Sequence, residues 1–234
     1  MSKVAVLSDI HANLTALNAV LTDCESKYSE VKFIHLGDCI DYGMRPNETI
    51  AELQKIPFIA NIKGNHERAI LGFEDERFSS PRGKEADNYT KSILNQSSLD
   101  YINSMDDNYK EVELCGKKIL FIHGDLADIY WGKMKDDEIT KEYYQKYDFV
   151  ISGHTHVSSL RTVINENKTH KTLFVNPGSV GQPRNLNPNA QYCVIDFGTS
   201  SIDFNSVAYD IIREQTLYNG EIDEYYKTRL SFGL

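Results

Sequence analysis

Histidine, aspartate and asparagine side chains recur at the places where apolar stretches of this sequence end. In chain order they are Asp9 and His11 in SDIH, Asp38 and Asp41 in GDCID, Asn65 and His66 in GNHE, His123 in IHGD, and His154 and His156 in GHTH. Each motif alone is common, because GD and GN are frequent turn dipeptides and Asp-x-His usually forms a plain loop. Five such endings in one chain are not expected of ordinary turns, so we interpret them as parts of one site.

The candidate metal ligands offer carboxylate and amide oxygens and imidazole nitrogens, and no thiolate. They are Asp9, His11, Asp38, Asn65, His123, His154 and His156. This donor set suits divalent ions, with Mn expected and Fe, Zn, Ni, Co or Mg as alternatives, better than a structural zinc site. Seven ligands exceed what one ion takes while it keeps a position for substrate. Two ions that share a carboxylate and lie about 3.5–4 Å apart can clamp both oxygens of an in-line displacement.

The elements that must position these residues alternate in the first part of the chain. Continuous apolar runs predict buried strands, and apolar residues at helical spacing predict the helices between them. We expect strands at 4–10, 32–38 and 57–65 and helices at 13–28 and 47–56. This alternation predicts parallel βαβ units, and ligands bind at the carboxyl ends of the strands in such sheets.

The remainder of the chain predicts a polar helical segment followed by further strands. We expect helices at 66–78, 84–96 and 98–105, a hairpin of 109–114 with 117–125 that turns at Gly116, strands within 148–154, 160–178, 191–197 and 201–209, and a helical tail from Ile211. The sum is one α/β domain over residues 1–234 with two sheets and outer helices.

Composition narrows the function. The chain has 234 residues and a formal net charge of -9, which argues against extended nucleic acid as a partner. It does not exclude a small phosphate-bearing substrate, because a bound cation reverses the local charge. Four widely spaced cysteines predict neither a disulfide framework nor a zinc knuckle. The short apolar run at the N-terminus predicts no signal peptide, and no run is long enough for a membrane span, so we expect a cytoplasmic protein with no membrane partner.

At this point the sequence resembles the calcineurin-like metallophosphoesterase superfamily. The family pattern D-x-H, G-D-x-x-D, G-N-H-[DE], H and G-H-x-H occurs in order from Asp9 to His156, and the later stretches NPGSVGQPRN and YCVIDF resemble its small bacterial phosphodiesterase-like branch. The resemblance implies two facing mixed β-sheets that form a sandwich flanked by helices. It also implies hydrolysis of phosphoester or phosphoanhydride bonds by a hydroxide that bridges the two ions.

The resemblance implies a role for each matching residue. One ion would be held by Asp9, His11, Asp38 and His156, and the other by Asp38, Asn65, His123 and His154. His66 would be the general acid that protonates the leaving oxygen, and Asp41 would be the partner that raises its pKa and fixes the imidazolium. We also expect His154 and His156 to lie on one side of an extended segment and to serve different ions.

One departure from the family pattern bears on the substrate. Protein phosphatases of this superfamily carry an arginine after the second aspartate of G-D-x-x-D, and this chain has Tyr42. A phosphodiesterase or dinucleoside polyphosphate hydrolase is therefore favoured over a phosphomonoesterase or protein phosphatase. Arg184, with Arg68 as a second candidate, is expected to contact the phosphate.

Two segments are expected to shape the substrate site. They are the helical segment 72–108 and an insertion at 125–147, in which Tyr130 or Trp131 could stack on a base or could simply cap the core. A non-catalytic scaffold is the alternative from another class. Such a protein is expected to have lost His66 or several ligands, and this chain has them all.

Overall fold

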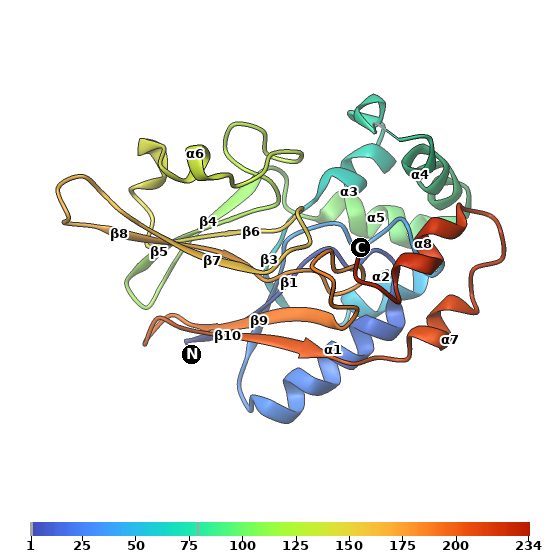
Figure 1. The fold of residues 1–234 in the computed structure, drawn as a ribbon, viewed down its shortest axis with the longest axis horizontal. Helices are drawn as coiled ribbons and strands as arrows, with labels where there is room; N and C mark the ends of the chain where they lie inside the picture. The colour runs from blue at the N-terminus through green and yellow to red at the C-terminus, as the bar shows by residue number, and fades with distance from the viewer. Residues whose placement is uncertain (1, 79) are drawn as a thin grey trace.

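Five strands form the first sheet, in the order β10-β9-β1-β2-β3 (Figure 1). The computed structural model describes residues 2–78 and 80–234; residues 1 and 79, the latter within the predicted helical segment 72–108, lie outside the described residues. The three parallel strands are β1 (Lys3–Leu7), β2 (Lys32–His35) and β3 (Phe58–Asn61), and the antiparallel strands are β9 (Ala190–Asp196) and β10 (Ser201–Val207).

Two helices connect the parallel strands as βαβ units. Helix α1 (Leu14–Lys27) begins where the side chain of Asn13 accepts a hydrogen bond from the backbone N–H of Ala16. Helix α2 (Pro46–Leu53) begins with proline, whose fixed φ and missing N–H suit the first helical position. The predicted strand–helix alternation is confirmed, and it brings the carboxyl ends of β1, β2 and β3 to one end of the sheet.

The second sheet also has five strands, in the order β4-β5-β6-β8-β7. Strands β5 (Lys117–Ile122), β6 (Phe149–Ser152) and β8 (Lys171–Asn176) are parallel, and β4 (Tyr109–Leu114) and β7 (Ser159–Ile164) are antiparallel edge strands. The predicted hairpin is confirmed, because Gly116 has φ 71° in the turn between β4 and β5. Positive φ at a hairpin turn matches the twist of the flanking strands.

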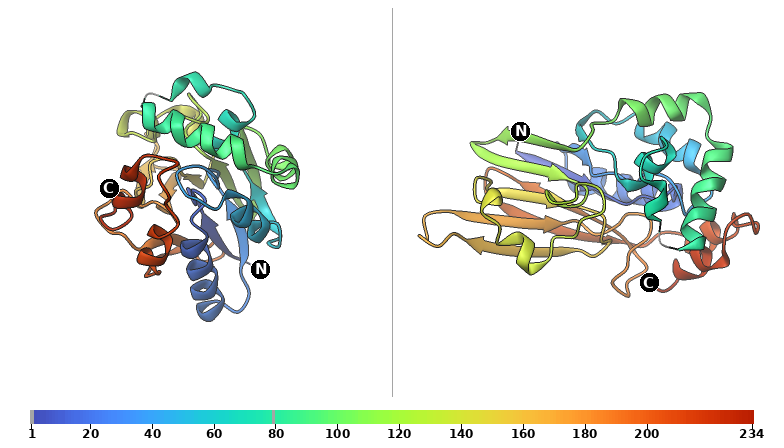
Figure 2. Two further views of the ribbon diagram at one scale, coloured as in Figure 1. Left: turned by 90° about the vertical axis from the view of Figure 1, so that its right-hand side faces the viewer. Right: turned by 90° about the horizontal axis from the view of Figure 1, so that it is seen from above.

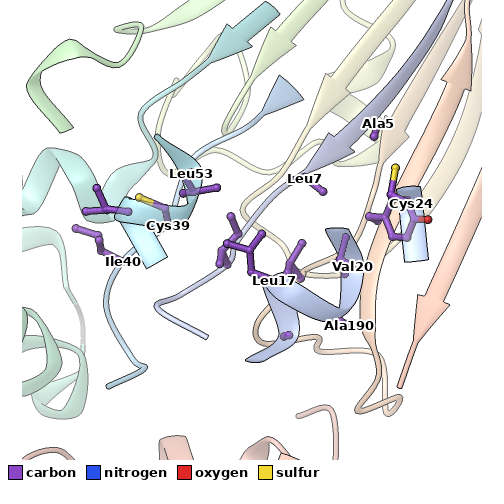
Figure 3. Packing of buried hydrophobic residues seen from close by; sticks show 14 of the residues in the cluster. Ala5, Leu7, Leu17, Val20, Cys24, Cys39, Ile40, Leu53 and Ala190 are labelled. Carbon is purple, nitrogen blue, oxygen red and sulfur yellow. The ribbon is translucent and has the colours of Figure 1, made fainter. Parts of the chain in front are cut away.

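The two sheets face each other across a shared apolar core. Val6 and Ile34 of the first sheet lie in one buried cluster with Phe121 and Ile151 of the second. On the outer face of the first sheet, Leu17 and other residues of α1 pack in a second buried cluster (Figure 3). The short helix α6 (Asp136–Ile139) and its neighbouring loops cover the second sheet. The predicted sandwich of two mixed sheets flanked by helices is confirmed.

The remaining helices gather beyond the end of the sandwich where the parallel strands finish (Figure 2, right). They are α3 (Asn65–Ile70), α4 (Pro81–Ile93), α5 (Gln96–Ser104), α7 (Ile211–Gln215) and α8 (Glu224–Arg229). The expected helix 66–78 was too long: α3 ends at Ile70, because Gly72 takes the left-handed φ of 84° that is typical just beyond a helix end. Within the described part of the chain, no helix is both long and apolar enough to cross a bilayer.

Candidate active site

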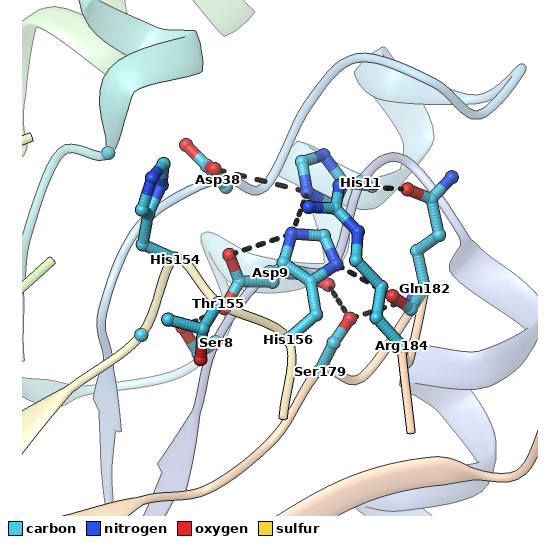
Figure 4. Close-up of polar contacts among 12 residues, drawn as sticks. Ser8, Asp9, His11, Asp38, His154, Thr155, His156, Ser179, Gln182 and Arg184 are labelled. Carbon is cyan, nitrogen blue, oxygen red and sulfur yellow. Dashed lines mark hydrogen bonds and ion pairs between the residues drawn. The ribbon is translucent and has the colours of Figure 1, made fainter. Parts of the chain in front are cut away.

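All the predicted ligands meet at the carboxyl ends of strands from both sheets. The residues that carry them lie in the loops after β1, β2, β5 and β6 and at the start of α3, which follows β3. Figure 4 shows the loops after β1, β2 and β6 converging on the same space. The side chains brought together are Asp9, His11, Asp38, Asn65, His123, His154 and His156.

Four of these residues form one group of donors. Asp9, His11, Asp38 and His156 each offer a ligand atom, and these atoms lie within 4.8 Å of one another. His11 Nε2 lies 3.1 Å from His156 Nε2, and His156 Nε2 lies 3.3 Å from Asp9 Oδ1. Such a group could hold a divalent metal ion.

A second group lies beside the first and shares Asp38 with it. Asp38, His123 and His154 offer ligand atoms within the same 4.8 Å limit, and His123 Nε2 lies 3.3 Å from Asp38 Oδ2. Asn65 belongs to this group by position, because its Oδ1 lies 3.0 Å from both His123 Nε2 and His154 Nδ1. Each half of the GHTH motif therefore faces a different group.

The surroundings of the imidazoles fit a bound cation. In His11, His123 and His156 the Nδ1 atom faces a backbone carbonyl, which fixes a proton there, so that in the neutral imidazole the Nε2 lone pair is free for a metal. The carbonyls belong to Ile40, Leu36 and Gln182, at 2.9, 2.7 and 2.6 Å. The lone pairs of His11 and His156 then face each other, and the buried Asp9 Oδ1 accepts no hydrogen bond among the described residues. Lone pairs concentrated in this way repel one another unless a cation lies between them.

Burial keeps three of the candidate imidazoles neutral. It lowers the pKa of His11 and His156 well below the usual value, and it lowers the pKa of His154 to about 3. Burial raises the pKa of Asp9 to about 7, and the neighbouring Asp38 adds to this rise. Neutral imidazole is the form that binds a metal, and a nearby cation would favour the ionised form of Asp9.

His66 is paired with Asp41 at the edge of the donor groups. Its Nδ1 lies 2.6 Å from Asp41 Oδ2, while its Nε2 faces Asp38 Oδ2 at 3.9 Å. Burial lowers the pKa of His66, but the carboxylates of Asp38 and Asp41 outweigh this and raise it above the usual value. His66 Nδ1 therefore donates to Asp41, and the raised pKa favours a second proton on Nε2, the ring nitrogen that faces the donor atoms.

Buried hydrogen bonds fix the loops that carry these residues. Glu67, which is fully buried, accepts hydrogen bonds from the backbone N–H groups of Asp38 at 2.8 Å, Cys39 at 2.7 Å and Gly64 at 2.7 Å. Ser179 donates from Oγ to the Asp9 carbonyl at 2.7 Å. The sequence placed Glu67 in the GNHE motif without a role, and the structure shows that it holds two ligand loops together.

Glycine allows the loops to approach closely. A Cβ atom at Gly64 would lie 2.1 Å from Asp38 Oδ1, and a Cβ at Gly153 would lie 2.1 Å from Ser8 Oγ. Real Cβ atoms do not approach other atoms so closely. The glycines of G-N-H-E and G-H-x-H are therefore needed for space beside the donors.

The backbone of the site corrects one expectation about His154 and His156. Their segment is not extended, because both residues have left-handed backbones with φ of 63° and 59°. Six further residues of the loops after β1 and β2 share this conformation, with φ between 49° and 65°: Asp9, His11, Ala12, Asp38, Asp41 and Tyr42. Left-handed backbone is unfavourable for residues with a Cβ, by roughly 1–2 kcal/mol each. The tight loops aim the side chains inward at this cost.

A cavity of about 430 Å³ opens beside the donors, and Arg184 lines it. Arg68 does not line it: its guanidinium packs on the rings of Phe73 and Tyr130, at 4.1 and 4.9 Å from their centroids. Tyr130 is turned away, with its hydroxyl oxygen accepting from the Asn108 N–H at 2.9 Å. The predicted segments contribute other residues to the lining: Arg77, Phe78, Ser80, Trp131 and Lys133. Apart from Trp131, the sequence carried no signal for them, because they are ordinary loop residues until the fold is known.

Tyr42 also lines the cavity, and the C-terminal tail holds it. The Tyr42 ring stacks on Tyr226 of α8, with centroids 4.5 Å apart and planes inclined by 14°. The Tyr218 hydroxyl donates to the Tyr42 carbonyl at 2.9 Å. On its other side the Tyr42 ring lies 4.6 Å from both His11 and His66. The tail thereby supports Tyr42, which lines the cavity, without lining the cavity itself.

A two-sheet sandwich with His, Asp and Asn donors at its strand ends is the architecture of a metallophosphoesterase. The chain belongs to the calcineurin-like phosphoesterase superfamily, whose family model matches residues 2–200. The superfamily resemblance seen in the motifs is thus confirmed, and members of this superfamily are metal-dependent phosphoesterases.

Similar proteins span nearly the whole chain. The uncharacterized protein MJ0912 of Methanocaldococcus jannaschii is 30% identical over 242 residues, covering 99% of this chain and 98% of its own. The crystal structure of a metallophosphoesterase from Sphaerobacter thermophilus has 26% identity, covers 99% of both chains and gives a TM-score of 0.81. The hypothetical protein PH1004 from Pyrococcus horikoshii OT3 has the same fold, with 22% identity, 100% and 99% coverage and a TM-score of 0.83.

Proposed function

We propose that this protein is a binuclear metal-dependent hydrolase of phosphoester or phosphoanhydride bonds. The observation that carries the proposal is the position of Asp38, which belongs to both groups of donors. Asp9, His11 and His156 would complete one ion's ligands, and Asn65, His123 and His154 the other's. Bound divalent ions, with Mn²⁺ expected and Fe, Zn, Ni, Co or Mg as alternatives, supply Lewis acidity and acidify water.

The residues around the donors would bind the substrate and move the proton. The pKa of His66 is raised and its Nε2 faces Asp38, so His66 would give the proton on Nε2 to the leaving oxygen. Asp41 holds the imidazole by its Nδ1 and favours the charged form. Arg184 lines the cavity and can contact the phosphate, whereas Arg68 packs on aromatic rings outside the lining, so we assign the phosphate contact to Arg184.

Within this reaction class, the site favours a phosphodiesterase or a dinucleoside polyphosphate hydrolase. At Tyr42 the cavity presents an aromatic ring and not the guanidinium with which protein phosphatases bind a phosphomonoester. The non-catalytic alternative is disfavoured because His66 and all the donor residues are present and lie together.

The activity is tested with purified protein, Mn²⁺ and a panel of phosphate esters. The panel contains bis(p-nitrophenyl) phosphate, p-nitrophenyl phosphate, dinucleoside polyphosphates, cyclic nucleotides and phosphopeptides. We expect hydrolysis of a diester or a polyphosphate, and loss of activity on chelation. Metal-loaded protein that cleaves none of these compounds would contradict the enzyme assignment.

The number of ions and the role of His66 are tested by metal analysis. Wild-type protein should bind two ions per chain, and Asp38→Asn should lose occupancy at both sites, while Asp9→Asn, the matched control, should weaken one. His66→Ala should lower turnover at unchanged metal content. Asp38→Asn protein that keeps one ion at full occupancy would disprove the bridge, and loss of metal from His66→Ala would show that His66 is a ligand.

A further inference from the structure

One wall of the cavity beside His66 is aromatic. The Phe78 ring lies 5.0 Å from the His66 ring, and the Trp131 ring lies 5.4 Å from Phe78 in an edge-to-face arrangement with an interplanar angle of 79°. Trp131 also lies 6.3 Å from the ring of His154. The two apolar rings thus extend from the proton donor along the side of the cavity, and we call them the Phe78–Trp131 wall.

His66 identifies which part of the substrate meets this wall. The acid must reach the oxygen of the leaving group, because that oxygen receives the proton. Phe78 is in contact with His66. Arg184, in contrast, belongs to the loop after β8, in which the Gln182 carbonyl accepts a hydrogen bond from His156 Nδ1. In a bound substrate the leaving group would therefore lie against Phe78 and Trp131, and the transferred phosphate would lie toward Arg184.

The charges at the wall indicate an anionic leaving group. Arg77 packs over the Trp131 ring at 5.1 Å from the centroid, and its guanidinium is paired with Asp128 at 3.0 and 2.5 Å. Its charge is therefore already matched, and it supports the indole. Lys133, in contrast, lines the cavity, and its ammonium makes no ion pair with any residue that the structure describes. An unpaired ammonium two residues from the indole favours a ligand with its own negative charge.

We propose that the Phe78–Trp131 wall and Lys133 bind the leaving group as a nucleoside phosphate. The flat base packs on the rings, and the phosphate that it carries meets Lys133. The inference rests on the proposed hydrolase function and adds the chemical class of the leaving group. A cavity of about 430 Å³ is of the size that binds a ligand of this kind.

Trp131 supplies a direct readout, because it is the single tryptophan of the chain. Its fluorescence is titrated in metal-loaded protein with AMP, with ribose 5-phosphate and with inorganic phosphate. AMP should quench the signal saturably and bind roughly 5- to 150-fold more tightly than ribose 5-phosphate, which is the range for stacking one base on an aromatic side chain. Equal affinities for AMP and ribose 5-phosphate would overturn the proposal.

Two variants and one control locate the binding, and all three keep the fluorophore Trp131. Phe78→Ala should weaken the binding of AMP and leave the binding of ribose 5-phosphate unchanged. Phe73→Ala is the matched control, because Phe73 lies in the same loop, is 48% exposed and does not line the cavity. Lys133→Ala should weaken AMP and ribose 5-phosphate alike, since both carry the phosphate. A Phe73→Ala loss equal to that of Phe78→Ala would place the base elsewhere.

Hydrolysis of bis(p-nitrophenyl) phosphate separates this proposal from the function on which it rests. If wild-type protein cleaves this diester but binds AMP no better than ribose 5-phosphate, the leaving-group assignment fails and the hydrolase stands. If AMP binds as expected and no ester is cleaved under any metal, the proposed function fails, and the wall loses its role in the reaction.

Discussion

Glu67 offers the sharpest test of how the site is held together, because it is buried and its carboxylate accepts hydrogen bonds from three backbone N–H groups around the site. One carboxylate oxygen accepts from Asp38 and Gly64, and the other accepts from Cys39. Substitution by alanine leaves all three N–H groups without an acceptor. Substitution by glutamine keeps the shape and replaces one oxygen with an amide NH₂.

The magnitudes follow from these three hydrogen bonds. A buried donor left without an acceptor costs about 1–3 kcal/mol, so Glu67→Ala should lose roughly 3–9 kcal/mol of unfolding free energy. In Glu67→Gln the remaining oxygen can serve Asp38 and Gly64, and only the Cys39 N–H loses its acceptor. Burial and the nearby Asp38 raise the pKa of Glu67, so its charge is not fully compensated and its removal offsets part of the loss. We expect Glu67→Gln to lose only about 1–2 kcal/mol.

Urea denaturation of chelated protein measures these differences without a contribution from metal. Glu25→Ala is the control, because Glu25 is exposed on α1 and such changes stay within about 0.5 kcal/mol. Metal analysis of the same variants should show occupancy falling in the order wild type, Gln, Ala. Glu67→Ala protein as stable as the Glu25→Ala control would refute the account of Glu67 as the residue that joins the two loops.

Three further substitutions test other parts of the site. Gly153→Ala should lower the metal content with little change in far-UV circular dichroism, because the added Cβ would lie 2.1 Å from Ser8 Oγ. The double variant Gly153→Ala, Ser8→Ala should regain part of the metal. A double variant with no more metal than Gly153→Ala would disprove the steric cause. Tyr226→Ala should destabilise the protein by about 3–5 kcal/mol and raise KM, because it removes the buried ring that stacks on Tyr42. Tyr226→Phe should match wild type, since the Tyr226 hydroxyl has no hydrogen-bond partner among the described residues. Asp41→Asn should move the alkaline limb of the pH–rate profile to lower pH, because Asp41 helps to raise the pKa of His66 and the acid acts while protonated. A limb that does not move would show that the titration of His66 does not cause it.

The sequence predicted the positions of the donors because the order of elements decides them. Once β1, β2 and β3 are parallel, the residues that follow them must meet at one edge, so Asp9, Asp38 and Asn65 could be placed together without coordinates. That the two sheets face each other was implied by the family resemblance, and the periodicity of the sequence did not predict it.

The rest of the site depends on contacts that a local pattern does not encode. Phe78 and Lys133 reach the cavity because α3 ends early at Ile70 and because the loop after β5 folds back over the site. Tyr226 meets Tyr42 from the far end of the chain, in a tail that lies beyond residues 2–200 matched by the family model. Left-handed φ at His154 and His156 was also missed, since only a minority of histidines adopt it and the residue type alone does not reveal which ones do.

The left-handed backbones of the ligand loops set heat resistance and chemistry against each other at the same positions. Glycine adopts such angles without steric penalty, so glycine in place of His154 or His156 would relieve backbone strain while it removes the imidazole. A library of this chain selected only for survival of heating would therefore accumulate glycine in these loops and lose its ligands one at a time. If the proposed function holds, selection for turnover is what keeps histidine and aspartate at angles that they do not prefer.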